Sequence, residues 1–415
     1  MWVSSRIDRL FDPAVVEDPH EYYAHLRVLD PVHEVAGTRT FLVTRMALIH
    51  EVVAKPAVFS SVNGEFLHVG DRGAASLRGA GPVGVDIGVG AVLATADPPV
   101  HTRQRTVVAR RLSAGAMQAM EPQFRELVDA HLDAALPGGH IEWMGQLAEE
   151  LPMVMVARIL GVPDDEAPRL KAQGYASVEA IGGFVSDERL RELGERMIDV
   201  GPVAEAYMVA RSSERRDTTT LIGVCAQAVD DGELNDMEAF AILFLLIAAG
   251  GESTTSLTGT GVRILAEQPD LQDRLRRDPG LIPAFVEEAC RIDPPFRGHY
   301  RRVLADTRLG GVDLLAGSTL VLAWSAANHD SEAFTRPDEI DLERPSPRQH
   351  VGFGWGIHLC VGAPLARLEA KVAFEQLLAR TASFSVDPDG LPLRHHQSLM
   401  VRRLVALPLI LEPRR

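Results

Sequence analysis

The ten residues FGWGIHLCVG, at positions 353–362, form the most informative pattern in this sequence. Its alternating glycines allow tight backbone turns and a close approach to a flat ligand or to another chain segment. Pro364 suits the first turn of a helix, and residues 364–378 continue at helical spacing. We therefore expect Cys360 just before a helix N-terminus, where free amide groups and the helix dipole stabilise a thiolate. Such a thiolate can act as a nucleophile or as a metal ligand.

The same segment is also compatible with three other interpretations. Most buried cysteines are inert small apolar residues. Alternating glycines also occur in nucleotide-binding loops, but no preceding strand and no ribose-binding acid support a dinucleotide site here. A cysteine hydrolase needs a histidine base and an orienting Asp or Asn, and His358, two residues from Cys360, is too constrained for that role.

Length and composition describe an ordinary globular chain of 415 residues, with 46% hydrophobic and 24% charged side chains. Because a single core usually stops growing at roughly 250 to 300 residues, length alone suggests two or three domains. However, short turns join the predicted elements almost throughout, and we find no internal repeat and no low-complexity linker. We therefore expect one domain over residues 1–415, with no fused reductase domain.

Charge and cysteine usage argue against several classes of function. The net charge is −15, since 42 Lys and Arg stand against 57 Asp and Glu, and this makes nucleic-acid binding an unlikely main task. Cys225, Cys290 and Cys360 form no CxxC pair, which excludes a disulfide framework and argues against a structural zinc site. No signal peptide is visible, and the most apolar run, residues 239–251, is shorter than the roughly 20 residues of a membrane span. We expect a cytoplasmic protein that is not an integral membrane protein.

Hydrophobic periodicity predicts that helices dominate the chain. The predicted helices cover residues 21–28, 46–53, 118–136, 147–160, 187–211, 237–268, 282–291 and 364–378. The predicted strands lie within residues 40–44, 304–323 and 399–411. Residues 62–92 hold eight glycines and no clear periodicity, which predicts either a functional lid or a plain surface excursion.

The predicted central helix carries a second unusual segment, AAGGESTT at residues 248–255. Asn235 and Glu238 form a plausible cap for this helix, which is apolar on almost every side. Its paired glycines each cost roughly 1 kcal/mol relative to alanine, so we expect a compensating role, such as close approach of a bulky ligand. Beside a metal-bound thiolate, Glu252 and the hydroxyls after it would deliver protons. The alternative is a small-residue helix crossing with an incidental acid.

Two charged pairs complete the set of candidate residues. Glu288 and Arg291 are three residues apart and share one face of a predicted helix. His101 and Arg105 are four apart in a helix that opens after two prolines, and they point the same way, as a clamp for an anion does. Taken alone, each pair is more often a solvated surface feature.

Together, in this order and at these distances, these segments resemble the bacterial soluble members of the cytochrome P-450 superfamily, the haem-thiolate monooxygenases. The cysteine-loop pattern Phe-Gly-x-Gly-x-His-x-Cys-x-Gly is met at every defined position by residues 353–362. The other matching positions are Glu288 and Arg291 with Arg344, His101 and Arg105, the propionate-binding Arg301, and Asn328, His329 and Asp330. The resemblance runs from about residue 18 to the C-terminus and is closest to an actinobacterial, mycobacterial-like branch.

The resemblance implies a mainly α (α+β) fold, a helix-rich triangular prism with a long central helix over haem and small β-sheets. It implies haem b (iron protoporphyrin IX) as the cofactor, with Cys360 as the proximal thiolate ligand of the iron, which favours cleavage of bound dioxygen. The implied haem-binding residues are His101, Arg105, Arg301 and His358 at the propionates, together with Phe353, Gly362, Ala249 and Gly250. In the same way, the Glu288 and Arg291 pair with Arg344 would stabilise the fold.

The implied catalytic residues are Glu252, Ser253 and Thr254, the acid and alcohols of oxygen activation. Here the sequence departs from the commonest pattern of the family, because the usual threonine after the acid is Ser253 and a second glycine precedes the acid. Serine keeps the hydroxyl but loses the methyl group that fixes the rotamer. Both Ser253 and Thr254 therefore stay candidates for the catalytic alcohol.

The implied function is insertion of one oxygen atom from O2 into a hydrophobic organic substrate, with electrons from a ferredoxin and a ferredoxin reductase. Four arginines, at 103, 105, 110 and 111, form a basic cluster that suits an acidic redox partner or is a solvated helix face. The implied pocket walls are residues 62–92, 174–185, 296–299 and 398–400, together with Phe244, Ile247 and Ala248. Within them, Arg297 and His299 can meet a carboxylate or phenol, or can serve the structure. Two alternatives remain: a haem-thiolate binding or sensing protein without turnover, and an H2O2-driven peroxygenase, although the acid and alcohol favour electron-driven oxygen activation.

Overall fold

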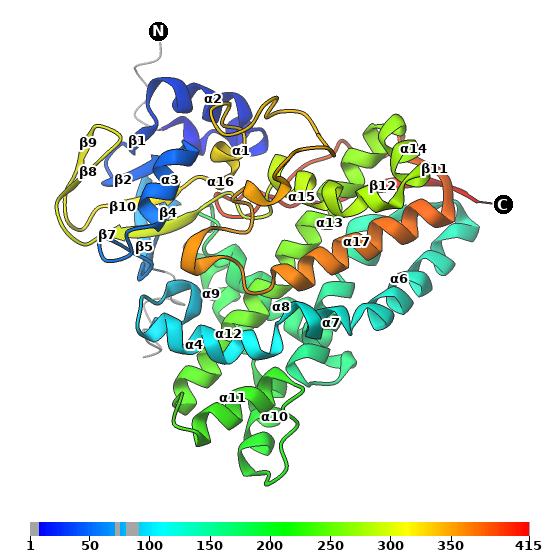
Figure 1. Ribbon diagram of the computed structural model, residues 1–415, viewed down its shortest axis with the longest axis horizontal. Helices are drawn as coiled ribbons and strands as arrows, with labels where there is room; N and C mark the ends of the chain where they lie inside the picture. Colours follow the sequence, from blue (N-terminus) through cyan, green and yellow to red (C-terminus); the bar gives the residue numbers. More distant parts are fainter. Residues whose placement is uncertain (1–7, 71–74, 80–90, 415) are drawn as a thin grey trace.

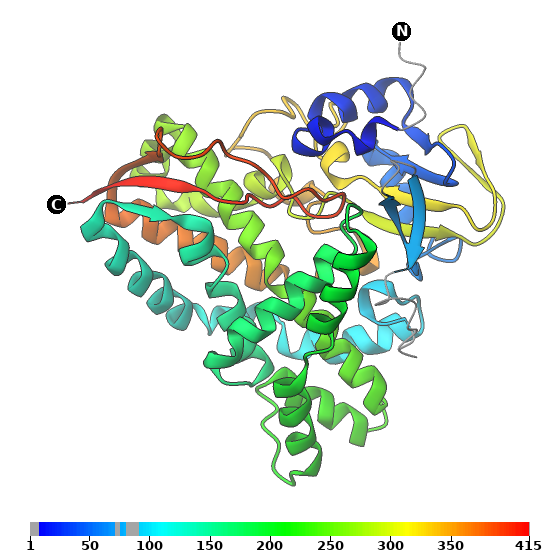
Figure 2. The same cartoon turned by 180° about the vertical axis from the view of Figure 1, so that it is seen from behind.

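A computed structural model describes residues 8–70, 75–79 and 91–414 of the chain. Helices dominate and the sheets are small, as predicted (Figure 1). Strands β1 to β5 gather with β7 to β10 at one side, and most helices fill the other side (Figure 1). Seen from behind, the outline is triangular, narrowing toward α10 and α11 (Figure 2).

The largest sheet joins parts of the chain that are far apart in sequence. Its strands run in the order β1 (Val32–Val35), β2 (Thr40–Val43), β10 (Thr319–Leu322), β7 (His299–Val303) and β3 (Phe59–Ser60). β10 pairs with β2 in parallel and with β7 in antiparallel orientation, so that Leu322 lies opposite His299. This register fixes where β7 presents its side chains.

The described residues also form three smaller sheets. They are β4 (Glu65–Val69) with β5 (Ala75–Gly79), β8 (Thr307–Leu309) with β9 (Val312–Leu314), and β11 (Thr381–Val386) with β12 (Pro408–Pro413) and β6 (His140–Glu142). The hairpin of β4 and β5 corrects the expectation that residues 62–92 carry no regular structure, although residues 71–74 and 80–90 of that segment lie outside the described residues.

The helices outside the centre pack in layers around it. They are α1 (Pro13–Glu17), α2 (His20–Leu29), α3 (Met46–Val53), α4 (Val100–Arg111), α5 (Ala114–Gln118), α6 (Glu121–Ala135), α7 (Leu151–Leu160), α8 (Ala167–Ala180), α9 (Asp187–Met197), α10 (Gly201–Ser212), α11 (Leu221–Asp230), α14 (Pro269–Arg277), α15 (Ile282–Ile292), α16 (Trp324–Ala327) and α17 (Ala363–Arg380). No helix was predicted over α8, α11 and α14, nor over the short helices α1 and α16. The main core cluster includes the buried faces of α6, α7, α13, α15 and α17.

Two sequence expectations are wrong in detail. Residues 187–211 form two helices, because Pro202 at the start of α10 cannot continue a helix from α9. The C-terminal strand is confined to β12, since residues 399–407 pair only through isolated bridges, and Arg402 and Arg403 turn inward to form ion pairs.

The central helix consists of two segments, α12 (Asp236–Gly250) and α13 (Glu252–Glu267). As predicted, Asn235 caps it: the Asn235 side chain accepts from the Glu238 amide, and the Glu238 side chain accepts from the Asn235 amide. Within the described part of the chain, residues 236–267 form the one helix that is long and apolar enough to cross a membrane, but 56% of its most apolar window is buried inside the protein. A central core helix has these same properties.

Candidate active site

The cysteine loop ends where α17 begins, as the sequence predicts. Gly354 and Gly356 have φ angles of +71° and +70°, a left-handed conformation that favours glycine. The Cys360 amide donates to the Phe353 carbonyl at 2.8 Å, which closes the loop, and α17 starts at Ala363. The loop therefore holds the Cys360 side chain at a helix N-terminus.

Cys360 lines an interior space. Its side chain is accessible, whereas Cys225 and Cys290 are buried. Burial nevertheless raises the pKa of Cys360, while the Gly362 amide, Arg367 and Arg105 act to lower it. A residue that is both accessible and surrounded by protein faces a cavity inside the molecule.

The last turn of α12 also carries accessible residues inside the protein. Ala249 is exposed and Ala248, Gly250 and Ser253 are partly accessible, although the neighbouring Ile247 is buried. Gly174 of α8 lies so close to α12 that a Cβ added to it would meet the Ile247 carbonyl oxygen at 2.9 Å. Packing is therefore tight on the α8 side of α12, and the accessible side of the helix is lined with small residues.

Four nitrogen-bearing side chains gather beside the cysteine loop. The rings of His101 and His358 lie 4.2 Å apart, and Arg105 donates to the Leu359 carbonyl at 2.6 Å. Burial, together with Arg301, His101 and Arg105, lowers the pKa of His358 to about 3. Both imidazoles are therefore neutral near pH 7, because burial also lowers the pKa of His101. Nε2 of His358 already shares a hydrogen bond of 2.9 Å with Ser61 Oγ, which leaves Nδ1 as the ring nitrogen of His358 that can meet a ligand.

This cluster fits an anionic ligand. The Arg301 guanidinium donates to the Tyr300 carbonyl at 2.7 Å, and Asp97 is the carboxylate that stabilises its charge. Asp97 is already engaged by the hydroxyl of Ser60 and the amide of Ser61. Among the described residues the cluster therefore has few counter-charges, and an anionic ligand whose metal is held by the Cys360 thiolate matches its donors.

Glu252 does not face Ser253 but points toward the C-terminal segment. Its Oε1 accepts from Arg403 Nε at 3.0 Å, and Arg403 Nη1 donates to Glu149 at 2.6 Å. Its Oε2 is buried without a hydrogen-bond partner. Burial raises the pKa of Glu252, and Arg403 only partly opposes that rise. The sequence analysis did not find Arg403, because its link to Glu252 spans 151 residues.

The two candidate alcohols have different surroundings. The Ser253 hydroxyl donates to the Ala249 carbonyl at 2.9 Å and stays partly accessible, whereas Thr254 is buried. Thr254 lies beside Glu369, whose carboxyl has no well-aligned partner and whose pKa burial raises well above its usual value. Of the two hydroxyls, only the Ser253 hydroxyl belongs to an accessible residue.

Glu288, Arg291 and Arg344 form a buried cluster and not a surface pair. Arg291 Nε and Arg344 Nε contact Glu288 Oε1 at 2.8 and 3.0 Å, and the Glu288 and Arg291 side chains are 0% exposed. Although burial raises it, the hydrogen bonds from both arginines bring the pKa of Glu288 below its usual value. The cluster ties α15 to the segment that leads into the cysteine loop.

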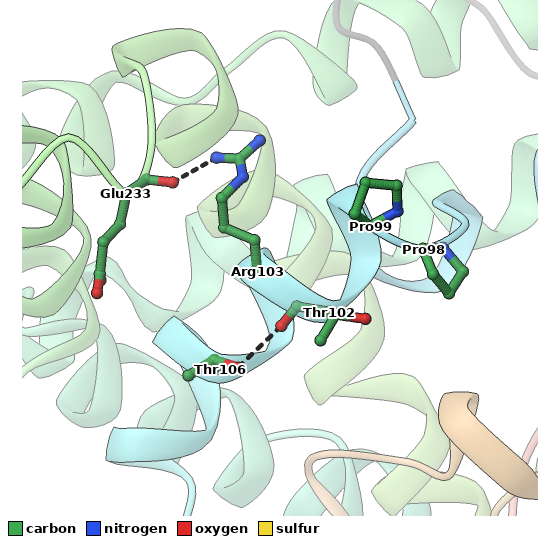
Figure 3. Close-up of a pocket in the computed structure, with 6 residues that line it drawn as sticks. All are labelled: Pro98, Pro99, Thr102, Arg103, Thr106 and Glu233. Atoms are coloured by element: carbon green, nitrogen blue, oxygen red, sulfur yellow. Dashed lines mark hydrogen bonds between the residues drawn. The ribbon is translucent and has the colours of Figure 1, made fainter.

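The arginines of α4 are more neutralised than the sequence suggested. Arg103 pairs with Glu238, and Arg110 pairs with Glu233 at 2.8 Å. Arg103 also lines an open surface groove of about 690 Å³, on the outer side of α4 (Figure 3). The residues of this groove are Pro98, Pro99, Thr102, Arg103, Thr106 and Glu233. The groove does not include Cys360 or the four side chains beside it.

Comparisons with known proteins agree with this geometry. The sequence profile of the family described as Cytochrome P450 matches residues 280–405. Cytochrome P450 144 of Mycobacterium tuberculosis is 36% identical over 414 residues, which cover 99% of this chain and 93% of that protein. A solved structure of cytochrome P450 CREJ in complex with (4-ethylphenyl) dihydrogen phosphate has a TM-score of 0.84 at 25% identity, covering 95% of this chain and 97% of that one. A solved structure of a mutant of P450 EryK in complex with erythromycin B has a TM-score of 0.80 at 30% identity, covering 98% of this chain and 99% of that one.

Proposed function

Because the chain belongs to the cytochrome P450 superfamily and is thereby a monooxygenase that binds haem b, we propose that it inserts one oxygen atom from O2 into a hydrophobic organic substrate, with electrons from a ferredoxin and a ferredoxin reductase. The observation that carries this proposal is the accessible Cys360 inside the protein, beside His101, Arg105, Arg301 and His358. Haem, when bound, supplies the redox chemistry that activates dioxygen. All further roles belong to side chains of this chain.

Cys360 would hold the iron through its thiolate. The Gly362 amide, Arg367 and Arg105 favour the ionised sulfur, and a metal ion removes the thiol proton outright. The four side chains beside the cysteine loop would bind the propionates, the two arginines through charge and the two neutral histidines through N–H. Phe353, Gly362, Ala249 and Gly250 would contact the rest of the haem.

Glu252 and Ser253 would move protons at the oxygen site. The Ser253 hydroxyl is the accessible one, so we assign it the role of the alcohol and leave Thr254 in the core. Glu252 would carry the proton on its unpartnered Oε2, because Arg403 already occupies Oε1. An acid with a raised pKa is a better proton carrier near neutral pH.

The reduced carbon monoxide spectrum tests the role of Cys360. The wild-type protein should be red and should show the red-shifted Soret band of thiolate ligation. Cys360→Ala should lose that band, whereas the matched control Cys225→Ala should keep it, because Cys225 lies buried in the core. A colourless wild-type protein after haem-replete expression would contradict the proposal, as would an unaltered spectrum of the Cys360 variant.

The ferredoxin partner is tested by charge exchange on α4. Arg110→Glu with Arg111→Glu should raise the ferredoxin concentration needed for half-maximal turnover several-fold and weaken its salt dependence, because an acidic partner loses attraction. Arg308→Glu is the matched control, since Arg308 also pairs with a carboxylate but lies on β8. Unchanged ferredoxin kinetics in the α4 variant would contradict docking at this face.

The substrate class is supported by three apolar side chains from the segments expected to form the pocket walls. Phe244, Phe296 and Leu399 are partly accessible and apolar, which suits a hydrophobic molecule. Erythromycin B in the P450 EryK complex and testosterone in the complex of CYP109E1 from Bacillus megaterium are consistent with this class. We place the protein in the cytoplasm, outside the membrane. Wild-type protein that binds haem through Cys360 but consumes no O2 with saturating donor would instead favour a sensing protein, and H2O2-driven turnover alone would favour a peroxygenase.

A further inference from the structure

Trp324 determines which ring nitrogen of His299 carries the proton. Trp324 Nε1 donates to His299 Nδ1 at 2.7 Å. An indole nitrogen can only donate, so Nδ1 of His299 must be the unprotonated ring nitrogen. Burial, and then the nearby Arg301, lowers the pKa of His299 to about 4, which keeps the ring neutral. The single ring proton is therefore on Nε2.

The indole is held firmly in place. Trp324 is 2% exposed and belongs to the core cluster beneath the large sheet. It follows β10 by two residues, and the last residue of β10, Leu322, lies opposite His299 of β7. The sheet register thus places Trp324 beside the His299 imidazole. The imidazole cannot rotate without losing its hydrogen bond from the indole.

The remaining ring nitrogen faces the haem cavity. His299 and Arg301 are two residues apart on β7, so their side chains lie on the same face of the sheet. His299 is partly accessible although protein surrounds it, and no described residue forms a hydrogen bond with its Nε2. His299 helps to lower the pKa of His358, as do Arg301, His101 and Arg105, and it therefore lies near the His358 ring. The five side chains therefore converge on one place.

From this geometry we propose that His299, oriented by Trp324, donates a hydrogen bond from Nε2 to a haem propionate beside Arg301. The inference rests on the proposed haem site and adds two residues to it: His299 as a contact and Trp324 as a positioning residue. It also assigns His299 to the cofactor, where the sequence left open a substrate contact or a structural role. Arg297, its neighbour in the sequence, instead donates to the Val16 carbonyl and belongs to the structure.

Haem loss from the holoenzyme is the first measurement. His299→Phe should transfer haem to excess apomyoglobin about tenfold faster than the wild type, because one charge-assisted hydrogen bond to a carboxylate is lost. His299→Gln should recover part of that loss, since the amide can still donate. The propionate bending band in the resonance Raman spectrum should shift in His299→Phe. An unchanged haem-loss rate and Raman band in His299→Phe would overturn the inference.

A double-mutant cycle tests the positioning role of Trp324. Trp324→Phe should speed haem loss in the wild-type background but have no further effect in the H299F background, because the indole acts through the imidazole. An equal effect in both backgrounds would mean that Trp324 acts only through packing, and it would overturn the positioning claim.

Two further outcomes separate this inference from its rivals. If His299→Phe weakens binding of lauric acid but not of its methyl ester, and haem loss is unchanged, then His299 meets a substrate carboxylate and the inference is wrong. If the wild-type protein itself binds no haem, that result contradicts the proposed function as well as the role of His299.

Discussion

At the scale of single residues, two buried carboxyl groups have different surroundings: Glu252, next to Ser253 in the sequence, and Glu369, beside Thr254. Glu252 has Arg403 as a partner, and Arg403 continues to Glu149, whose other oxygen lies 3.4 Å from Lys171. Glu369 has no ion-pair partner among the described residues, and its pKa is raised well above its usual value. Only Glu252 is thus connected through charged groups toward the surface, which favours it as the group that exchanges protons.

Glu252→Gln is expected to slow oxygen-dependent turnover by about 10²-fold, the usual contribution of a positioned proton donor, while haem content stays the same. The control Glu238→Gln removes an acid from the first turn of α12 and should have little effect on turnover. Both variants are compared by substrate oxidation at saturating ferredoxin. Equal rates for Glu252→Gln and the wild type would contradict the role of Glu252.

The pH dependence of turnover follows from the raised pKa of Glu252. A carboxyl group with a raised pKa keeps its proton at pH values where an exposed glutamate has lost it. The wild-type rate should therefore fall as the pH rises through the pKa of Glu252. The rate of Glu252→Gln should be low and flat over the same range, because the amide does not titrate.

At the scale of elements, packing requires a small residue at the break between α12 and α13. A Cβ added to Gly251 would meet Met153 Sδ at 2.1 Å and Tyr175 Cε1 at 3.5 Å. The Tyr175 hydroxyl shares a hydrogen bond of 2.9 Å with Thr255 Oγ1, which ties α8 to the first turn of α13. The glycine pair predicted either the close approach of a bulky ligand or a small-residue helix crossing. For Gly251, the structure shows that the near neighbours are protein side chains.

Gly251→Ala should destabilise the protein by about 1–3 kcal/mol, the usual cost of overpacking a core. Gly115→Ala on α5 is the matched control, because nothing lies within 4 Å of its added Cβ, and it should be neutral or slightly stabilising. Urea unfolding monitored by far-UV circular dichroism measures both variants. A Gly251→Ala midpoint equal to that of the wild type would show that Met153 moves aside at little cost.

At the scale of the whole molecule, features that depend on neighbouring residues could be predicted from the sequence, whereas contacts between distant segments could not. The cysteine loop, the cap at Asn235 and the start of α17 depend on neighbouring residues, and all three were correctly predicted. The links from Arg403 to Glu252 and from Trp324 to His299 depend on how separate segments meet, and a single sequence holds no local signal for them. The same reason explains the strand predicted over residues 399–407, where inward-facing ion pairs replaced a regular sheet.

The cluster of Glu288 with two arginines connects several layers to the cysteine loop. Arg344 also donates to the Thr335 carbonyl at 2.9 Å, and the Asp341 amide donates to Glu288 at 2.9 Å. The segment that precedes the cysteine loop is therefore anchored to α15 by buried charged groups. Removing one arginine leaves Glu288 with an incomplete set of donors in a buried position, which is costlier than losing a surface pair.

Arg344→Met is expected to lower the free energy of unfolding by about 3 kcal/mol, the lower end for breaking a buried ion pair, because Arg291 still holds Glu288. Arg274→Met is the matched control, since Arg274 pairs with Glu343 at the surface, and its loss should cost less than about 1 kcal/mol. In urea, the thiolate Soret band of Arg344→Met should disappear before the helical dichroism does, because the weakened segment leads directly to Cys360. Coincident transitions at the wild-type midpoint would show that the cluster does not anchor the cysteine loop.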